Sequence, residues 1–428
     1  MNLKKPHIPN SRPGDGKRPQ TFTAIGDRYQ SDVSIGPGDS PLADAFGRMR
    51  IAAPLTVFDS KLIQDNSPLF WDDAVLSGAG TSSTHSVNQA SVTLAVGNLT
   101  AGRRARQTKR RFNYQPGKSS LIVMTGVLGA GAPGITKRVG YFDDKNGIFL
   151  SLVGSVLSVN RRSFVTGVAV DESVPQSSWN LDKMDGEGFS GVTLDVTKTQ
   201  IFFIDIEWLG VGRVRCGFYI DGLPIYVHQF THANKLNIVY MSTPNLPLRY
   251  EISNNGTGPA ASLTQICSTV VVEGGQDDTG ITRAFHMGNT ALTFATAGAT
   301  PAVLAIRLKT THQGITVKLL GHSILCSTPN DQFAWAWILN PTSAVALTFV
   351  DQPNSAMQVA VGTSTALLTG GEIASAGYGI SNDPQRLQLS THEILGSTIA
   401  GVSDILYLAI IPFASLHVSA AVQWRELV

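Results

Sequence analysis

Two carboxylates, Asp205 and Glu207, lie two residues apart in the alternating run IFFIDIEW (201–208). Because successive side chains of a β-strand face opposite sides of a sheet, this spacing puts both carboxylates on one face. Glycosidases use such a pair, with one carboxylic acid whose pKa is raised. The register derived below sets Glu207 opposite Arg215, and a neighbouring cation lowers a carboxyl pKa. We therefore predict a structural cross-strand ion pair between Glu207 and Arg215 and no enzymatic activity.

The histidines and cysteines do not form a metal-binding motif. His228 and His232 are four residues apart, but the segment around them reads as strand and turn, whereas a His-Glu-x-x-His zinc site requires a helix. The three cysteines, at positions 216, 267 and 326, are too widely spaced for a metal site or a disulfide framework. Cys216 lies on the apolar face of its strand and is expected to be a small buried hydrophobic residue. No cofactor is predicted.

A compact basic run, GRRARQTKRR (102–111), could neutralise phosphate groups. The chain as a whole has a formal net charge of only +2, and the run lacks the interleaved aromatic residues that stack on bases. We favour a solvated segment or a contact with an acidic neighbouring subunit over nucleic acid binding. The candidate contact residues are Arg103, Arg104, Arg106, Lys109, Arg110 and Arg111.

Trp335 and Trp337 are two residues apart and therefore share one face of a strand. Exposed, the two indole rings could stack on sugar rings and bind a host glycan. Buried, they would form part of the core of a second sandwich. Phe333 lies on the same face, which favours the buried interpretation.

The elements that would position these residues are clearest in residues 201–230, which read as three antiparallel strands. A three-residue first turn, Gly210–Gly212, would pair Trp208 with Val214 and Ile206 with Cys216. The second turn, Asp221-Gly222, is a strong hairpin signal that sets Phe218 opposite Ile225 and Cys216 opposite Val227. Pro224 cannot donate to a ladder, so the third strand is expected at a sheet edge or with a bulge.

The whole chain is predicted to be all-β, with an extended N-terminal arm followed by two β-sandwich domains of jelly-roll or lectin-like type. The expected boundaries are residues 1–60 for the arm, 61–280 for the first sandwich and 281–428 for the second. One short helix is expected near the N-terminus, over residues 41–51. Neither an apolar signal segment nor a run of 18 apolar residues is present, so no secretion and no membrane span is predicted.

Composition favours a chain that makes extensive contacts with neighbours. Charged residues are 15% of the 428 residues, against roughly 25% in average soluble domains. A Ser/Thr/Gly-rich β-protein that covers much of its surface with other subunits fits this deficit.

Several segments resemble a family of virion structural proteins from tailed bacteriophages, many of which infect aquatic bacteria. They are AFGRMRIAAPLTVFD (45–59), YQPGKS (114–119), QSSWNLDKMDGEGFSGVTLD (176–195), IEWLGVGRVRCGF (206–218), LPLRYEI (246–252) and QICSTVVVEGG (265–275). The resemblance spans residues 40–275, and the terminal QWREL (423–427) is also similar. The strand–Asp-Gly–strand meander also resembles lectin-type sandwiches.

The resemblance implies a non-enzymatic particle component assembled in the host cytoplasm. We expect a peripheral place (tail, baseplate, neck or fibre attachment), anchoring through the N-terminal arm, and homotypic contacts. The expected partners are other virion proteins and further copies of the chain, a trimer being one option. Neither a membrane nor nucleic acid is an expected partner. Two alternatives stay open: a capsid decoration protein, and a host-glycan receptor-binding protein.

Overall fold

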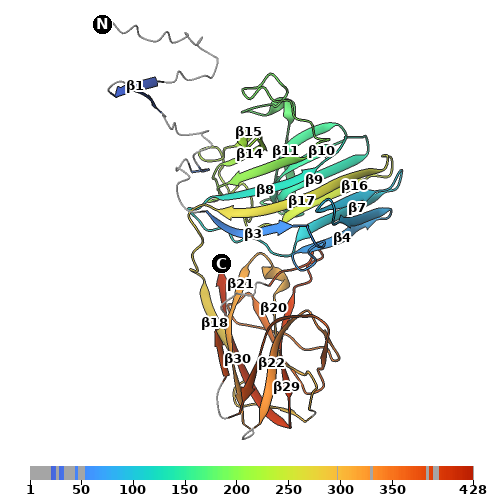
Figure 1. Ribbon diagram of the computed structural model, residues 1–428, viewed down its shortest axis with the longest axis vertical. Helices are drawn as coiled ribbons and strands as arrows, with labels where there is room; N and C mark the ends of the chain where they lie inside the picture. The colour runs from blue at the N-terminus through green and yellow to red at the C-terminus, as the bar shows by residue number, and fades with distance from the viewer. Residues whose placement is uncertain are drawn as a thin grey trace.

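The computed structural model describes residues 21–25, 28–32, 44–46, 54–295, 297–327, 331–381, 385–388 and 395–427. Figure 1 shows two β-rich bodies stacked along the long axis, the first coloured blue to yellow and the second orange to red. The described helices are two 3-10 turns, η1 (Gln176–Ser178) and η2 (Thr310–His312). No described helix has the length and apolar character needed to cross a bilayer.

The first body is a sandwich of two antiparallel sheets. Its seven-stranded sheet has the order β12-β11-β10-β9-β16-β7-β4, and its eight-stranded sheet has the order β15-β14-β13-β8-β17-β6-β5, with β3 also paired to β17. The strands of the seven-stranded sheet are β4 (Trp71–Gly78), β7 (Gly102–Thr108), β9 (Ile135–Phe142), β10 (Gly147–Val153), β11 (Val156–Ser163), β12 (Val170–Pro175) and β16 (Leu248–Asn254). Those of the eight-stranded sheet are β3 (Leu55–Lys61), β5 (Thr81–Ser86), β6 (Ser91–Val96), β8 (Ser120–Val127), β13 (Gln200–Ile206), β14 (Val214–Ile220), β15 (Leu223–Phe230) and β17 (Ala261–Val272).

The second body is also a sandwich. A five-stranded sheet (β18-β30-β21-β28, with β19 on β30) packs on a six-stranded sheet (β24-β25-β20-β29-β22-β27). The first comprises β18 (Ile281–His286), β19 (Leu292–Phe294), β21 (Thr316–Cys326), β28 (Gln385–Gln388) and β30 (Leu416–Leu427). The second comprises β20 (Ala302–Leu308), β22 (Gln332–Leu339), β24 (Val350–Asp351), β25 (Met357–Val361), β27 (Glu372–Ile380) and β29 (Ile405–Pro412). Two small pairs complete the chain: β1 (Thr21–Ile25) with β2 (Arg28–Asp32), and β23 (Thr342–Ser343) with β26 (Leu368–Thr369).

The prediction of an all-β chain with two sandwiches is confirmed. β3 belongs to the first sandwich, through its pairing with β17, although it falls within the residues assigned to the arm. The predicted helix at 41–51 lies outside the described residues apart from 44–46, which contain a turn. Residues 164–169 and 236–241 form loops.

The first hairpin of the predicted meander is shifted by two residues. Ile206 pairs with Val214 and Ile204 with Cys216, because β13 ends at Ile206 and the loop is longer than three residues. A shift of two keeps every side chain on its original face, so apolar residues still oppose apolar residues. Alternation in the sequence therefore could not distinguish the two registers.

The second hairpin agrees better with prediction. Asp221 and Gly222 both have positive φ, at 49° and 80°, as a type I′ turn requires. Phe218 lies opposite Ile225 as expected, but a bulge after Cys216 places His228 opposite that cysteine in place of Val227. β15 is an edge strand of its sheet, which confirms the inference from Pro224.

Candidate functional site

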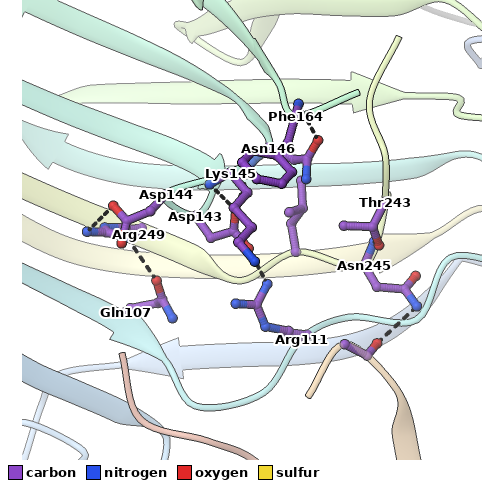
Figure 2. Close-up of polar contacts among 12 residues, drawn as sticks. Gln107, Arg111, Asp143, Asp144, Lys145, Asn146, Phe164, Thr243, Asn245 and Arg249 are labelled. Atoms are coloured by element: carbon purple, nitrogen blue, oxygen red, sulfur yellow. Dashed lines mark hydrogen bonds and ion pairs between the residues drawn. The ribbon is translucent and has the colours of Figure 1, made fainter. Parts of the chain in front are cut away.

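A polar recess of about 490 Å³ lies where the two sandwiches meet. One wall comes from the first sandwich: β7, the β9–β10 turn, β16 and the segment before it. The other wall comes from residues 310–315 of the second sandwich and from Ile399. We call this recess the polar cleft. Figure 2 shows the residues of the first wall and their polar contacts.

The β9–β10 turn holds its shape through Asp143. One carboxylate oxygen accepts hydrogen bonds from the backbone N–H groups of Lys145 and Asn146, both at 2.8 Å. The other oxygen lies 2.5 Å from a guanidinium nitrogen of Arg111 (Figure 2). Burial alone would raise the pKa of Asp143, but the Arg111 charge and the backbone hydrogen bonds together lower it. This carboxylate is therefore an ionised support for the turn.

A glycine closes the same turn. Gly147 has φ +151°, and a Cβ added there would lie 2.0 Å from the Cβ of Phe142. The tight return of the chain places Asn146 where its side-chain oxygen accepts from the backbone N–H groups of Phe164 and Ser242, at 3.2 and 3.0 Å. The turn thereby joins the β11–β12 loop to the segment that precedes β16.

A cluster of three arginines around one carboxylate adjoins the polar cleft on the outer face of the seven-stranded sheet. Glu251 is 1% exposed, and its carboxylate lies 2.7 Å from Arg249, 2.9 Å from Arg103 and 2.6 Å from Arg138. Burial raises the pKa of Glu251, but the three cations outweigh it and bring that pKa to about 2. The carboxylate stays ionised at any ordinary pH and cannot serve as a general acid.

The cluster continues to the rim of the cleft. Arg249 also donates to the side-chain oxygen of Gln107 at 3.3 Å and lies 3.3 Å from the carboxylate of Asp144 (Figure 2). Aromatic rings on this face are covered: Arg249 lies over Phe142, with 5.5 Å from the guanidinium carbon to the ring centroid. Because cations cover its rings, the face offers hydrogen-bonding groups and no open platform for stacking on a sugar.

Direct hydrogen bonds connect the sandwiches around the cleft. The Asn245 side chain donates to the carbonyl of Gly314 at 3.0 Å, and the Ile399 N–H donates to Asp72 at 2.7 Å. The carbonyl of Lys109 accepts from the Ser397 N–H at 2.9 Å. On the first wall, Lys145 is exposed and can offer its charge to a ligand. On the second wall, the side chains around η2 have hydroxyl and amide groups that can both donate and accept hydrogen bonds.

The prediction of an ion pair between Glu207 and Arg215 is wrong, because the observed register of the hairpin differs from the predicted one. Arg215 lies opposite Asp205 and makes its ion pair with that carboxylate, and both side chains are fully buried. Glu207 lies beyond the end of β13, where its carboxylate accepts from the backbone N–H of Arg213 at 3.5 Å. Neither Asp205 nor Glu207 lines the polar cleft. The sheet face that carries Asp205 is therefore buried, since Phe203 on the same face is only 1% exposed.

Trp335 and Trp337 are 6% and 0% exposed and belong to the core of the second sandwich. The Trp337 N–H donates to Nδ1 of His322 at 2.9 Å, and the His322 ring meets Trp335 edge to face. Their predicted alternative role in glycan stacking is excluded by this burial, because a ligand cannot reach either ring. The interpretation of both as core residues is confirmed.

The basic run occupies β7, an interior strand between β16 and β4, and most of its charges are satisfied within the chain. Arg104 lies 2.7 Å from Asp73, and Arg106 is fully buried and donates to Gln265 at 2.7 Å. The prediction of a subunit or nucleic acid contact is wrong for Arg106, because its side chain is fully buried. For Arg103, Arg104 and Arg111, which are paired within the chain but partly exposed, that contact stays a prediction. The sequence could not show that β7 has a neighbour on each side.

The other two basic residues of the run lie at the junction of the sandwiches. Lys109 accepts a hydrogen bond through its backbone, as stated above, and the Arg110 guanidinium lies 5.9 Å from the ring centroid of Phe70. Among the described residues, no group of three or more His, Cys, Asp or Glu side chains could hold a metal ion. His228 and His232 are buried, and burial lowers the pKa of each. Cys216 is buried, as expected.

The sequence analysis missed Glu251, Arg249 and Asp143. A signal was present in LPLRYEI (246–252), where Arg249 and Glu251 alternate with Leu248 and Tyr250. Such alternation predicts a strand whose charged residues share a face, but it does not show which strands bring Arg103 and Arg138 beside them.

No protein-family model and no curated protein sequence matches the chain. Similar solved structures include a protein of unknown function from Shewanella oneidensis MR-1, 8% identical, with 54% of this chain and 91% of that chain covered and a TM-score of 0.35. A β-glucanase of Bacillus licheniformis is 12% identical, with 51% and 98% covered and a TM-score of 0.34. The CBM2 module of the evolved Dit of Lactobacillus casei BL23 phage J-1 is 8% identical, with 53% and 99% covered and a TM-score of 0.34. These likenesses concern the fold alone.

Proposed function

We propose that the chain is a non-enzymatic structural component of a tailed phage virion, placed peripherally in the tail, baseplate, neck or at a fibre attachment. The sequence segments over residues 40–275 support the virion assignment through their resemblance to such proteins. One structural observation carries the non-enzymatic part. The Glu251 carboxylate is held by three arginines that lower its pKa, so it lacks the raised pKa of a catalytic acid, and Asp205 is buried in an ion pair with Arg215.

The N-terminal residues anchor the protein to its neighbours in this proposal. Deleting residues 1–40 tests it, because the deletion ends before residues 44–46, whose backbone carbonyls at Asp44 and Ala45 accept hydrogen bonds from Arg213 at 3.2 and 3.1 Å. The sandwiches should fold normally, whereas incorporation into particles, measured by mass spectrometry of purified virions, should be lost.

A matched control replaces residues 1–40 with a Gly/Ser chain of equal length, which keeps the reach of the segment and removes its side chains. This variant should also fail to incorporate if the native residues make the contact. Full incorporation of both variants would refute the anchoring role. Absence of polysaccharide cleavage by the intact protein tests the non-enzymatic part, and cleavage that is lost in Glu207→Gln would overturn it.

Two other places or roles compete with this one. A capsid decoration protein would differ by its position in the particle, which a whole-particle density map resolves. Binding of a host-surface glycan is favoured by one observation, the polar cleft, whose lining offers amide, hydroxyl and charged groups to a polyhydroxylated ligand. A glycan-binding role predicts that the protein binds glycans on an array and that Lys145→Ala weakens this binding. An array to which the protein does not bind would exclude the role.

A further inference from the structure

Strand β27 is an unusual edge strand. It ends the six-stranded sheet, and within the described residues it pairs with β22 alone. An edge strand presents a row of backbone N–H and C=O groups that can pair with another extended chain. β27 is nine residues long, and after Glu372 at its first position it has neither a charged residue nor a proline through Ile380. Its one bulge, at Ala374, lies near the start of the strand and leaves Ser375–Ile380 regular.

Most other sheet edges in the described residues carry a feature that discourages such pairing. Charges, prolines and short length are the usual protective devices. The protected edges include β12 with Asp171, Glu172 and Pro175, β4 with Asp72 and Asp73, β15 with Pro224, β18 with Arg283, and the two-residue β24. β5 has only Ser, Thr and His side chains. β27 is distinct in combining length, neutrality and apolar exposure.

An exposed apolar patch lies along β27 on the outer face of its sheet. Tyr378 is 78% exposed and Ile373 is 67% exposed, with Phe413 and Ile380 at 50% and 44%. The Tyr378 and Phe413 rings lie 6.4 Å apart between centroids. A contiguous exposed apolar patch that includes two aromatic rings is typical of a protein contact surface.

The rest of the outer face is already covered. A small apolar cluster that includes Ala336, Ile338 and Leu368 packs there, with Leu347 and Phe349 against it. On β27 the inward positions opposite Phe333 and Trp335 are glycines, and Ala374 is the β27 residue that packs against the core. The side chains that β27 does carry, at Tyr378 and Ile380, are therefore available for a partner.

We propose that β27 pairs antiparallel with β27 of a second copy of this chain, which joins the two six-stranded sheets across a two-fold axis near Gly377. This inference rests on the proposed role as a virion component, for which the sequence led us to expect homotypic contacts, and it specifies the strand that makes them. With the axis at Gly377, Tyr378 of each copy lies opposite Ala376 of the other, so a large side chain meets a small one on the same face.

The position of the charged residue in β27 is also compatible with pairing of the strand to a second copy of this chain. Antiparallel pairing sends the two Glu372 carboxylates to opposite ends of the new ladder, on the order of 30 Å apart for strands with a rise of about 3.3 Å per residue. No like charges face each other, and the apolar patch of one copy continues into that of the other. A two-fold contact of this kind is isologous and closes after two subunits.

The experiment measures the mass of the full chain in solution by light scattering over a range of concentrations up to about 100 µM, because association depends on concentration. The wild type should approach twice the chain mass. Tyr378→Lys places a cation in the patch of each copy and should return the mass to that of one chain. Since Tyr378 is exposed, the variant should fold normally, which circular dichroism checks.

The matched control is Leu223→Lys, which changes an apolar residue that is 69% exposed on the edge strand β15, beside Pro224. This variant should keep the mass of the wild type. A monomeric wild type, a trimeric mass, or a Tyr378→Lys variant that still associates would each overturn the pairing of β27. None of these results decides the virion role, which depends on incorporation into particles.

Discussion

Among the ionised groups described above, the Glu251 carboxylate should contribute most to the folding free energy of the first sandwich. Its pKa falls from the ordinary 4.5 to about 2 in the folded chain. This difference corresponds to about 3 kcal/mol of folding free energy, because each pH unit is worth about 1.4 kcal/mol. A carboxylate whose folded pKa is lowered stabilises the protein above its unfolded pKa, and this stability is lost as the pH falls from about 4.5 toward 2.

The substitution Glu251→Gln keeps the shape of the side chain and removes its charge. At neutral pH it leaves the buried Arg249, together with Arg103 and Arg138, without a shared counter-ion, which should cost about 3–5 kcal/mol. The matched control is Asp144→Asn, because Asp144 also contacts Arg249 and Arg103 but its side chain is 58% exposed. An exposed pair contributes about 0–1 kcal/mol, so the control should change little.

Native-state hydrogen exchange of peptides from β16 and β9 gives a local measurement, which is needed because unfolding of a two-sandwich chain need not be two-state. The wild type should lose protection as the pH falls below about 4.5, and Glu251→Gln should show low protection with little dependence on pH. Equal protection of the variant and the wild type at neutral pH, within about 0.5 kcal/mol, would show that the three arginines do not depend on this carboxylate.

Two further predictions concern the second sandwich and the β9–β10 turn. Burial lowers the pKa of His322 to about 4, so the second sandwich should be fully stable above about pH 6.5 and lose up to about 3 kcal/mol as the pH falls toward 4. Thermal unfolding of His322→Gln, which can still accept from Trp337, should lack this pH dependence, and an unchanged dependence would reject the assignment. Gly147→Ala should destabilise the first sandwich by several kcal/mol in urea unfolding, since the new Cβ would meet Phe142. Gly154→Ala, with φ +57° and open space, should cost only about 1 kcal/mol, and equal losses in the two variants would contradict the clash.

The fold class could be predicted because strand periodicity depends only on local alternation. The Asp221-Gly222 turn was predicted with its pairing at Phe218. The register of the preceding hairpin could not be predicted, because a shift of two residues leaves both faces unchanged. Loop length determined that register, and the loop has no Asn-Gly or Asp-Gly signal.

The candidate site was harder to predict because its residues are far apart in the sequence. Arg103, Arg138 and Glu251 come from β7, β9 and β16, which are neighbours only once the strand order is known. The carboxylate pair that the sequence did suggest, Asp205 and Glu207, is divided by the end of a strand. Alternation shows which residues share a face, but only the order of strands shows which charges meet.

The burial of charged side chains inside the sandwiches fits the proposed contact between copies of this weakly charged chain. Eleven of the described Asp, Glu, Lys and Arg residues are buried: Asp44, Arg106, Lys137, Asp143, Asp182, Asp205, Arg215, Arg249, Glu251, Asp404 and Glu426. Charges inside the sandwiches do not hydrate the exterior or repel neighbours, so only part of the 15% of charged residues in the chain acts at its surface. Such an exterior has few charges that oppose association, and β27, which is long and carries exposed apolar side chains, is where that association should begin.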